Sequence, residues 1–307
     1  MVKKVGNVSI DYTFYAGNDL YSDGDVEDEL LDIVKKYPKS EFNRIIDERN
    51  KWPILYHLSH IRENILNWYP FEEDATVLEI GSGCGAITGA VASKVKSVTC
   101  IELSEKRSLI NAHRNNEHDN ILIRLGNFET VEKEITEKYD YITLIGVLEY
   151  ANVYINSNNP YEDFLNKIIS HLKPNGKLIV AIENRLGMKY FAGCREDHNG
   201  YFFEGIEEYS NTNGAKTFSK NALEKLFSKV GFNKQEFYYP YPDYKFPMAI
   251  YSDECLPKIG ELDRNIRNMD ADRMMLFNEA LALNGMVDDG LFPLFSNSFL
   301  VELERGK

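Results

Sequence analysis

Three alternating glycines with an acidic residue just ahead of them form the stretch of this sequence best suited to bind a ligand. The glycines are Gly81, Gly83 and Gly85. They follow the aliphatic run 77–80, which contains Glu79 and predicts a buried strand, and they precede residues 86–94, which predict a helix. Glycine permits a tight turn and close approach of a ligand to bare backbone, and the first amides of a helix are unpaired and partly positive. The stretch therefore predicts a seat for a polar or anionic ligand group at the carboxyl end of a strand.

The glycine spacing separates two classes of nucleotide site. A dinucleotide site has the spacing Gly-x-Gly-x-x-Gly, whereas the pattern here is acid-x-Gly-x-Gly-x-Gly. In this form the stretch resembles the first motif of class I S-adenosylmethionine (SAM)-dependent methyltransferases. A second acid, Glu102, ends the next apolar run about twenty residues later, where a carboxylate can accept both ribose hydroxyls. An NAD-dependent oxidoreductase and a Rossmann-like domain that binds nothing stay as alternatives.

The resemblance, which covers roughly residues 53–252, implies which residues hold SAM or its product, S-adenosylhomocysteine. They lie in the glycine stretch and after the second, third and fourth predicted strands: Glu79, Gly81, Gly83, Gly85, Glu102, Leu103, Asn127, Phe128, Gly146 and Val147. In the family a side chain after the third strand, usually an aspartate, faces the adenine amino group. Here Asn127 can serve through its carbonyl oxygen, and Phe128 offers an apolar face.

The segment 146–150 is similar to the loop that small-molecule methyltransferases place between cofactor and substrate. It lacks the Asp/Asn-Pro-Pro-aromatic motif of enzymes that methylate exocyclic or amide nitrogens. A hydroxyl acceptor benefits from a base, and the two candidates are His198 and Glu149. We place His198 first, because it titrates nearer neutral pH and the adjacent Asp197 can hold its imidazole in one tautomer. A small amine acceptor, and a methyltransferase-like module that binds a partner without transferring methyl groups, stay as alternatives.

No metal site is expected. His60 and Asn64 lie on a predicted helix without two further ligands. The acidic stretch that begins at Asp19 fails the spacing of a calcium loop, because Tyr21 and Leu30 stand where ligand oxygens are required. The four cysteines lie far apart, so neither a zinc site nor a disulfide framework is indicated.

Composition and charge exclude several classes of function. The formal net charge is -13 over 307 residues, which argues against non-specific binding to nucleic acid. Hydrophobic residues make up 43% of the chain, ample for a core. No apolar run reaches membrane-spanning length, and the N-terminus has no hydrophobic signal region. We expect a cytoplasmic protein with no nucleic-acid partner and no membrane insertion.

Alternating strand and helix patterns predict an α/β, Rossmann-like fold with a mainly parallel sheet and helices on both faces. The predicted strands of this part are 77–80, 98–101, 121–124, 141–145 and 177–182. The predicted helices between them are 86–94, 105–116, 130–137 and 161–172. Two later strands, 237–241 and 246–252, pair antiparallel in the family and would complete a seven-stranded sheet.

Three segments are expected along the chain. They are a strand and helical region at 1–75, the SAM-binding core at 76–252 and an extension at 253–307. Within the core, glycines alternate with aromatic residues at 186–217, which suggests a lid suited to a sugar face or another amphipathic ligand. A loop packed on its own core is the alternative.

The extension has two predicted elements. Apolar spacing over residues 259–283 predicts a long helical segment interrupted near Asp270, and residues 298–304 predict a strand. The chain stops three residues later, which suggests a module cut from a longer polypeptide. Domains with such tails resemble methyltransferase domains encoded with bacterial glycan-assembly enzymes. By that analogy we expect a small-molecule or carbohydrate hydroxyl as acceptor, a role in glycan biosynthesis and a glycosyltransferase partner.

Overall fold

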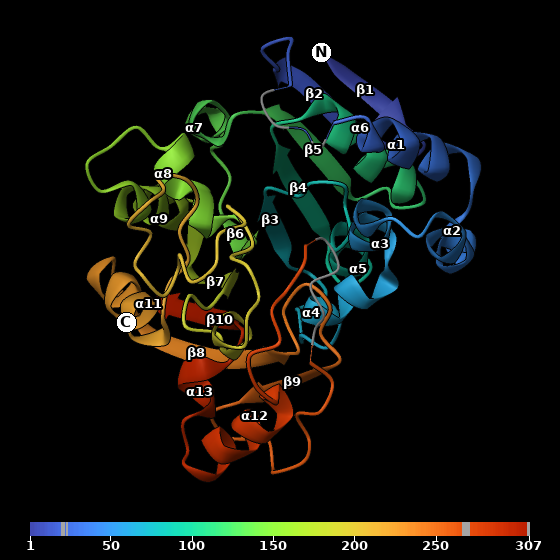
Figure 1. Ribbon diagram of the computed structural model, residues 1–307. Helices are drawn as coiled ribbons and strands as arrows, with labels where there is room; N and C mark the ends of the chain where they lie inside the picture. The colour runs from blue at the N-terminus through green and yellow to red at the C-terminus, as the bar shows by residue number, and fades with distance from the viewer. Residues whose placement is uncertain (20–21, 23, 266–270, 306–307) are drawn as a thin grey trace. The chain divides into compact units, whose positions relative to one another are not determined.

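The structure is a computed structural model that describes residues 1–19, 22, 24–265 and 271–305 (Figure 1). The chain forms two compact units. The first contains residues 1–144 and 170–176, and the second contains 145–169 and 177–307. The units do not follow the expected boundaries at 75 and 252, and the three-segment division stays a prediction.

The first unit contains a mostly parallel group of strands in the order β1-β2-β5-β4-β3-β6. Their bounds are β1 Val2–Val5, β2 Val8–Phe14, β3 Thr76–Ile80, β4 Ser97–Glu102, β5 Ile121–Gly126 and β6 Tyr139–Ile145. Strands β1 and β2 form an antiparallel hairpin, while β2, β5, β4, β3 and β6 pair in parallel. The chain passes from β3 to β4 and β5 on one side and places β6 on the other side. The carboxyl end of β3 is therefore the point where strand order reverses, which is where ligands of such sheets bind.

Short helices surround these strands in the first unit. They are α1 Val26–Lys36, α2 Phe42–Arg49, α3 Trp52–Leu58, α4 Asn64–Asn67, α5 Thr88–Ala92, α6 Glu105–Arg114 and α7 Phe128–Val131. The 3-10 turns are η1 Lys39–Glu41, η2 His60–Glu63 and η3 Glu132–Glu134.

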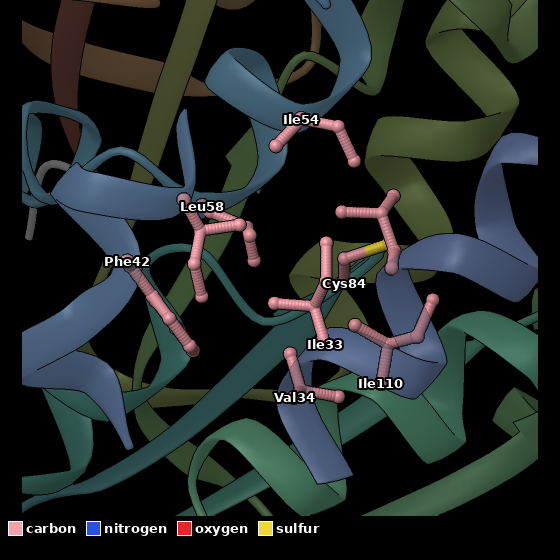
Figure 2. Packing of buried hydrophobic residues seen from close by; sticks show 9 residues of the cluster. Ile33, Val34, Phe42, Ile54, Leu58, Cys84 and Ile110 are labelled. Carbon is pink, nitrogen blue, oxygen red and sulfur yellow. The ribbon is translucent and has the colours of Figure 1, made fainter. Parts of the chain in front are cut away.

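A buried apolar cluster anchors the glycine stretch to these helices. Figure 2 shows Cys84, the residue between the second and third glycines, packed among side chains from α1, α2, α3 and α6. The labelled neighbours are Ile33, Val34, Phe42, Ile54, Leu58 and Ile110. Cys84 is only 2% exposed. Burying this side chain fixes one side of the loop, because a close-packed core leaves its members little freedom to move.

The second unit is built on four antiparallel-paired strands in the order β7-β10-β8-β9. Their bounds are β7 Leu172–Glu183, β8 Phe232–Tyr241, β9 Ala249–Ser252 and β10 Ser298–Arg305. The helices are η4 Leu148–Tyr150, α8 Ala151–Tyr154, α9 Pro160–Ser170, α10 Met188–Phe191, α11 Lys220–Lys229, α12 Glu279–Asp288 and α13 Phe292–Phe295. None of the described helices is long and apolar enough to cross a membrane.

The predicted α/β class is confirmed, with two corrections. All eight strands predicted with bounds are present, and the strand expected within 1–75 is a two-stranded hairpin, so the described residues contain ten strands instead of a seven-stranded core. The N-terminal hairpin accounts for two, and β10 pairs on one side with β7 and on the other with β8, so the C-terminal strand is not outside the core. The long helical segment predicted over 259–283 is wrong where it is described, because only its last residues are helical, in α12. Ile259 is 61% exposed and Leu276 is 51% exposed, so the apolar spacing there forms no buried stripe. Asp270 lies outside the described residues.

A chain of buried polar side chains joins the glycine stretch to three elements. Glu79 on β3 accepts a hydrogen bond from Thr88 Oγ1 on α5, at 2.7 Å. Thr88 Oγ1 in turn accepts one from Asn111 Nδ2 on α6, at 3.2 Å. Asn115, just past α6, donates from Nδ2 to Asn111 Oδ1 at 2.8 Å and to the carbonyl oxygen of Gly85 at 3.2 Å. All four side chains are buried, so these bonds fix the loop relative to β3, α5 and α6.

This buried chain predicts a pH dependence of stability. Burial raises the pKa of Glu79 to about 7, although hydrogen bonds from Thr88 and Cys100 act the other way. In the unfolded chain a glutamate titrates near ~4.3. Folding therefore favours protonated Glu79, and the stability gained from it is full below about pH 4 and is lost as the pH rises to about 7.

The test compares Glu79→Gln, which cannot ionise, with the unsubstituted chain. We expect the free energy of unfolding of the variant, relative to that of the unsubstituted chain, to rise between about pH 4.5 and 7 and then level off. Urea unfolding at a series of pH values measures it. Exposed Glu73→Gln controls for the substitution itself. A difference for Glu79→Gln that stays constant with pH would contradict the assigned ionisation.

Candidate active site

The three glycines of the loop have different surroundings. All have positive φ angles, +71° at Gly81, +52° at Gly83 and +72° at Gly85, which L side chains rarely adopt. A Cβ added to Gly85 would overlap Asn111 Oδ1 and lie 2.8 Å from Asn115 Nδ2. A Cβ added to Gly83 would meet no described atom within 4 Å. Gly85 therefore serves packing against the residues of α6, whereas Gly83 borders space that a ligand can enter.

Glu102 lies at the end of β4 with its carboxylate against the same loop. Its Oε2 accepts a hydrogen bond from Gly83 N at 2.7 Å, and its Oε1 accepts one from Ser104 N at 3.0 Å. The side chain is nearly buried, and burial raises its pKa in spite of these amides and the nearby charge of Arg107. A carboxylate has about four acceptor positions, so both oxygens keep capacity for the hydroxyls of a ligand.

Asp19 fixes the start of α6 beside Glu102, a role that the sequence did not indicate. Its Oδ1 accepts a hydrogen bond from Glu105 N at 2.7 Å, and its Oδ2 accepts one from Ser104 Oγ at 2.9 Å. Ser104 Oγ itself caps the helix by accepting from Arg107 N at 3.2 Å. These contacts hold the backbone that follows Glu102. Asp19 and Ser104 are 85 positions apart, so no local pattern could reveal the contact.

The residues after β5 are partly committed to local structure. Asn127 is the N-cap of α7, and its Oδ1 accepts a hydrogen bond from Glu129 N at 2.8 Å. The carbonyl oxygen expected to face adenine therefore already carries one hydrogen bond and keeps one lone pair. Phe128 and Leu103 are half-buried.

Eight of the ten expected cofactor residues thus lie at or just beyond the carboxyl ends of the neighbouring strands β3, β4 and β5. An open approach to Gly83, a carboxylate at the end of β4 and half-buried apolar side chains after β4 and β5 fit a nucleoside-bearing ligand. The other two residues, Gly146 and Val147, follow β6 and belong to the second unit.

In the second unit, the two candidate bases lie together. Glu149 lies in η4 after β6, and His198 lies in the segment after α10. His198 Nε2 is 3.7 Å from Glu149 Oε1 and 4.0 Å from Oε2 of Glu183, the last residue of β7. Glu149 is 1% exposed and the side chain of His198 is 8% exposed. The sequence thus identified two members of one buried cluster but missed Glu183, whose place depends on pairing across the sheet.

The expected partner of His198 is wrong. His198 Nδ1 lies 2.9 Å from Glu196 Oε1, and Glu196 Oε2 accepts a hydrogen bond from the backbone N–H of His198 at 2.8 Å. Asp197 instead forms ion pairs with Lys189 at 2.8 Å and Lys245 at 2.7 Å. A turn stabilised by Glu196 directs the imidazole and the neighbouring carboxylate to different partners.

Charges around His198 determine the proton positions in this cluster. Burial alone would lower the pKa of His198, but Glu183, Glu149 and Glu196 together hold that pKa well above its ordinary value. Burial raises the pKa of Glu149 in spite of the adjacent imidazole. Burial also acts to raise the pKa of Glu183, but the charges of Lys245 and His198 outweigh it and lower that pKa. The surroundings therefore favour an imidazolium flanked by carboxylates.

The segment 186–217, expected to act as a lid, contains a well-packed interior. Tyr190, Cys194 and Tyr209 are buried, and Tyr209 Oη lies 2.7 Å from the hydroxyl of Thr217, which is also buried. Tyr201, in contrast, is 60% exposed. These contacts fit the alternative of a loop packed on its own core, and the role of the segment as a lid stays a prediction.

A strand order that reverses at β3, a glycine loop with positive φ angles and a carboxylate at the end of β4 are typical of a Rossmann-like α/β fold. A family model described as "Methyltransferase domain" matches residues 54–236, more than half of the chain. This chain belongs to that family. The expected class of SAM-dependent methyltransferase is thereby confirmed, and SAM is its cofactor.

Individual relatives are more distant. The ubiquinone biosynthesis O-methyltransferase of Rickettsia typhi is 28% identical over 170 residues, which span 52% of this chain and 63% of the relative. The ribosomal RNA small subunit methyltransferase A of Syntrophus aciditrophicus is 27% identical over 119 residues, 39% of each chain. These matches span less than two thirds of the relatives' length. A solved SAM-dependent methyltransferase from Archaeoglobus fulgidus, 12% identical, covers 83% of this chain and 100% of its own with a TM-score of 0.51, which shows a shared fold.

We expect the same substitution to have different effects at the second and third glycines of the loop. In Gly83→Ala and Gly85→Ala the positive φ imposes a similar cost of about 1–2 kcal/mol. Only the Gly85 variant also overlaps the side chain of Asn111. We expect Gly85→Ala to lower the melting temperature more than Gly83→Ala does. We expect Gly83→Ala to weaken S-adenosylhomocysteine binding at least about tenfold while staying folded, because its methyl group enters the ligand space.

Calorimetric titration and thermal unfolding of both variants measure these effects. Unchanged affinity in folded Gly83→Ala would remove this glycine from the ligand seat. Equal melting temperatures would mean that Asn111 yields without cost.

Proposed function

We propose that this chain transfers a methyl group from SAM to a hydroxyl of a small molecule, with a sugar as the acceptor class favoured by the sequence analogy. The observation that carries the proposal is the buried pairing of Glu149 with His198. Glu149 lies two residues after Val147, in the segment that follows β6. A hydroxyl acceptor needs a group that takes its proton, and this pair can provide one. A glycosyltransferase partner is proposed from the sequence analogy alone.

The cofactor contacts that the family resemblance implies are supported, for the glycine loop and Glu102, by the geometry of these residues. Bound SAM supplies a methyl group that its sulfonium already activates. The backbone at Gly81 and Gly83 would contact the amino-acid end of SAM. Glu79 and Gly85 stabilise the loop through hydrogen bonds with the buried residues Thr88 and Asn115. Glu102 would accept the ribose hydroxyls. The remaining contacts proposed for the adenine and the methyl-bearing end are Leu103, Asn127, Phe128, Gly146 and Val147. The main task of these residues is to align donor and acceptor and to exclude water.

Within the pair, we place Glu149 before His198 as the proton acceptor, which reverses the order expected from the sequence. Both ring nitrogens of His198 already face carboxylates, at 2.9 Å for Nδ1 and 3.7 Å for Nε2. Glu149 Oε2, in contrast, is buried and accepts no hydrogen bond from any described residue. An acceptor hydroxyl can donate to this oxygen, and its proton can pass to Glu149 as the new oxygen–carbon bond forms.

The cofactor assignment is tested by ligand binding. S-adenosylhomocysteine should raise the melting temperature of the chain, and NAD should not. Glu102→Ala should weaken S-adenosylhomocysteine binding by about ten- to a hundred-fold, because a charge-assisted contact to two hydroxyls contributes on the order of 1.5–3 kcal/mol. Calorimetry provides the affinity. An effect below about twofold would exclude the ribose contact, and stabilisation by NAD would favour the oxidoreductase.

The acceptor assignment is tested by transfer of labelled methyl from SAM to a panel of sugars, phenols and amines. We expect transfer to a hydroxyl, and a loss of kcat of about a hundred-fold or more in Glu149→Gln with S-adenosylhomocysteine affinity retained. His198→Ala should also lose activity, and exposed Glu207→Gln should not. Normal turnover of an amine in both variants would overturn the hydroxyl proposal. Cofactor binding without transfer to any compound would favour the non-catalytic module.

A further inference from the structure

We infer that Glu149, Glu183 and His198 in the second unit bind a divalent transition-metal ion. The site departs from the sequence expectation of no metal, because its three residues lie on separate elements and share no motif spacing. Binding of the ion is independent of the proposed function. Its role in catalysis, described below, rests on that function.

The separations of the donor atoms fit one shared ion. Glu149, Glu183 and His198 each offer one ligand atom, and these atoms all lie within 4.8 Å of one another. The two pairs that involve His198 Nε2 are 3.7 Å and 4.0 Å apart. Donor atoms bound to one ion at about 2.1–2.4 Å lie roughly 3–4.8 Å from each other. The three side chains therefore need little movement to share an ion.

Buried oxygens in this cluster lack hydrogen-bond partners. Glu149 Oε2 and both carboxylate oxygens of Glu183 accept no hydrogen bond from the described residues. Glu183 Oε1 does lie 2.6 Å from Lys245 Nζ, an ion pair without hydrogen-bond geometry, and its Oε2 faces His198. Glu149 is 1% exposed and Glu183 is fully buried. Glu149 Oε2 is therefore the oxygen of this cluster with no partner among the described residues, and a bound cation would offset the cost of burying its carboxylate.

Negative charge exceeds positive charge in the buried network around His198. Its carboxylates are Glu149, Glu183, Glu196, Asp197 and Asp243. Its lysines are Lys189 and Lys245. Both lysines contact Asp197, Lys189 also lies 2.7 Å from Asp243, and Lys245 lies 2.6 Å from Glu183 Oε1. Even an imidazolium at His198 would leave five acids against three cations. A divalent ion between Glu149 and Glu183 would add positive charge beside Glu149, for which the described residues show no lysine partner.

The imidazole is already oriented as a metal ligand. Metal-bound histidines usually donate their second ring N–H to a carboxylate, which fixes the tautomer and directs the other nitrogen to the ion. Glu196 Oε1 lies 2.9 Å from His198 Nδ1, so it can accept that hydrogen bond, and Nε2 then faces Glu149 and Glu183. Glu196 is itself held by backbone N–H donors of His198 and Asn199, at 2.8 Å and 2.9 Å.

The donor set selects the kind of metal. One imidazole nitrogen with two carboxylates suits Mn²⁺, Fe²⁺ or Zn²⁺ better than Ca²⁺ or Mg²⁺, which prefer sites of oxygen alone. Three protein ligands leave open positions for a substrate oxygen. In the proposed reaction an acceptor hydroxyl bound there would lose its proton more readily, and that proton would pass to a carboxylate oxygen of Glu149 that does not contact the ion. The deprotonated acceptor oxygen would attack the methyl carbon of SAM. The carbon–sulfur bond would break at the same time, and its electron pair would stay on sulfur.

The test is Mn²⁺ binding to the full chain. A chelator first removes any bound metal, Mn²⁺ is then added, and electron paramagnetic resonance measures the Mn²⁺ that stays free. We expect one ion per chain with a micromolar dissociation constant, and competition by Zn²⁺ but not by Mg²⁺ at equal concentration. Glu149→Gln, Glu183→Gln and His198→Gln should each weaken binding at least about tenfold. Glu207→Gln, an exposed acid in the same segment, should bind as the unsubstituted chain does.

Two further measurements keep the outcomes distinct. Circular dichroism and S-adenosylhomocysteine affinity identify a variant that has merely unfolded, and at least one of the three substitutions must stay folded for the comparison. No Mn²⁺ or Zn²⁺ binding below about millimolar concentration, or equal binding in folded site variants and the control, would overturn the site. Methyl transfer that proceeds fully in chelator without metal would leave the proposed function standing and remove the catalytic role of the ion.

Discussion

The hydrogen bonds that run from Glu79 through Thr88 and Asn111 to Asn115 and the carbonyl oxygen of Gly85 are the constraint on which the proposed cofactor site depends. A glycine loop has little intrinsic preference for one conformation, so a binding loop of this kind must be held by its surroundings. These bonds hold it from β3, α5 and α6, and Cys84 holds it from the apolar cluster. Because these protein contacts hold the loop, ligand binding need not order it, which lowers the entropic cost of association.

The two polar centres of the protein differ in how well they are satisfied. In the first unit, the oxygen of Glu79 that faces the loop has a hydroxyl donor, and both oxygens of Glu102 accept backbone N–H groups. In the second unit, Glu149 and Glu183 are as deeply buried but have oxygens that accept no hydrogen bond from the described residues, although Glu183 pairs with Lys245. Buried polar groups without hydrogen bonds occur mainly at functional sites, where a ligand or the reaction supplies the missing partner. This contrast favours a supporting role for Glu79 and a direct chemical role for Glu149.

Local sequence patterns were enough to predict the approximate bounds of eight of the ten described strands and the glycine loop, because their signals lie within about ten residues. They could not show that Gly85 packs against Asn111 whereas Gly83 borders open space, since that distinction depends on Asn111, which lies on α6. The adjacency of Asp197 and His198 in the sequence also led to the wrong prediction that Asp197 contacts the imidazole. The partner is Glu196, because a turn and not an extended segment positions the imidazole. From the sequence, Glu183 could be predicted only to follow a strand. Its proximity to His198 depends on the fold of the second unit.

The C-terminal strand shows why the candidate catalytic cluster could not be derived from the central part of the sequence. Asn297, directly before β10, accepts a hydrogen bond from Lys189 N at 2.9 Å and donates one to the carbonyl oxygen of Pro242 at 3.0 Å. Ser298 Oγ accepts one from Tyr244 N at 2.8 Å. These contacts fix the backbone on which Lys189, Asp243 and Lys245 stand, and those residues set the charge around Asp197 and Glu183. A strand expected to lie outside the core, with the residue before it, therefore positions Lys189 and Lys245 of the candidate site.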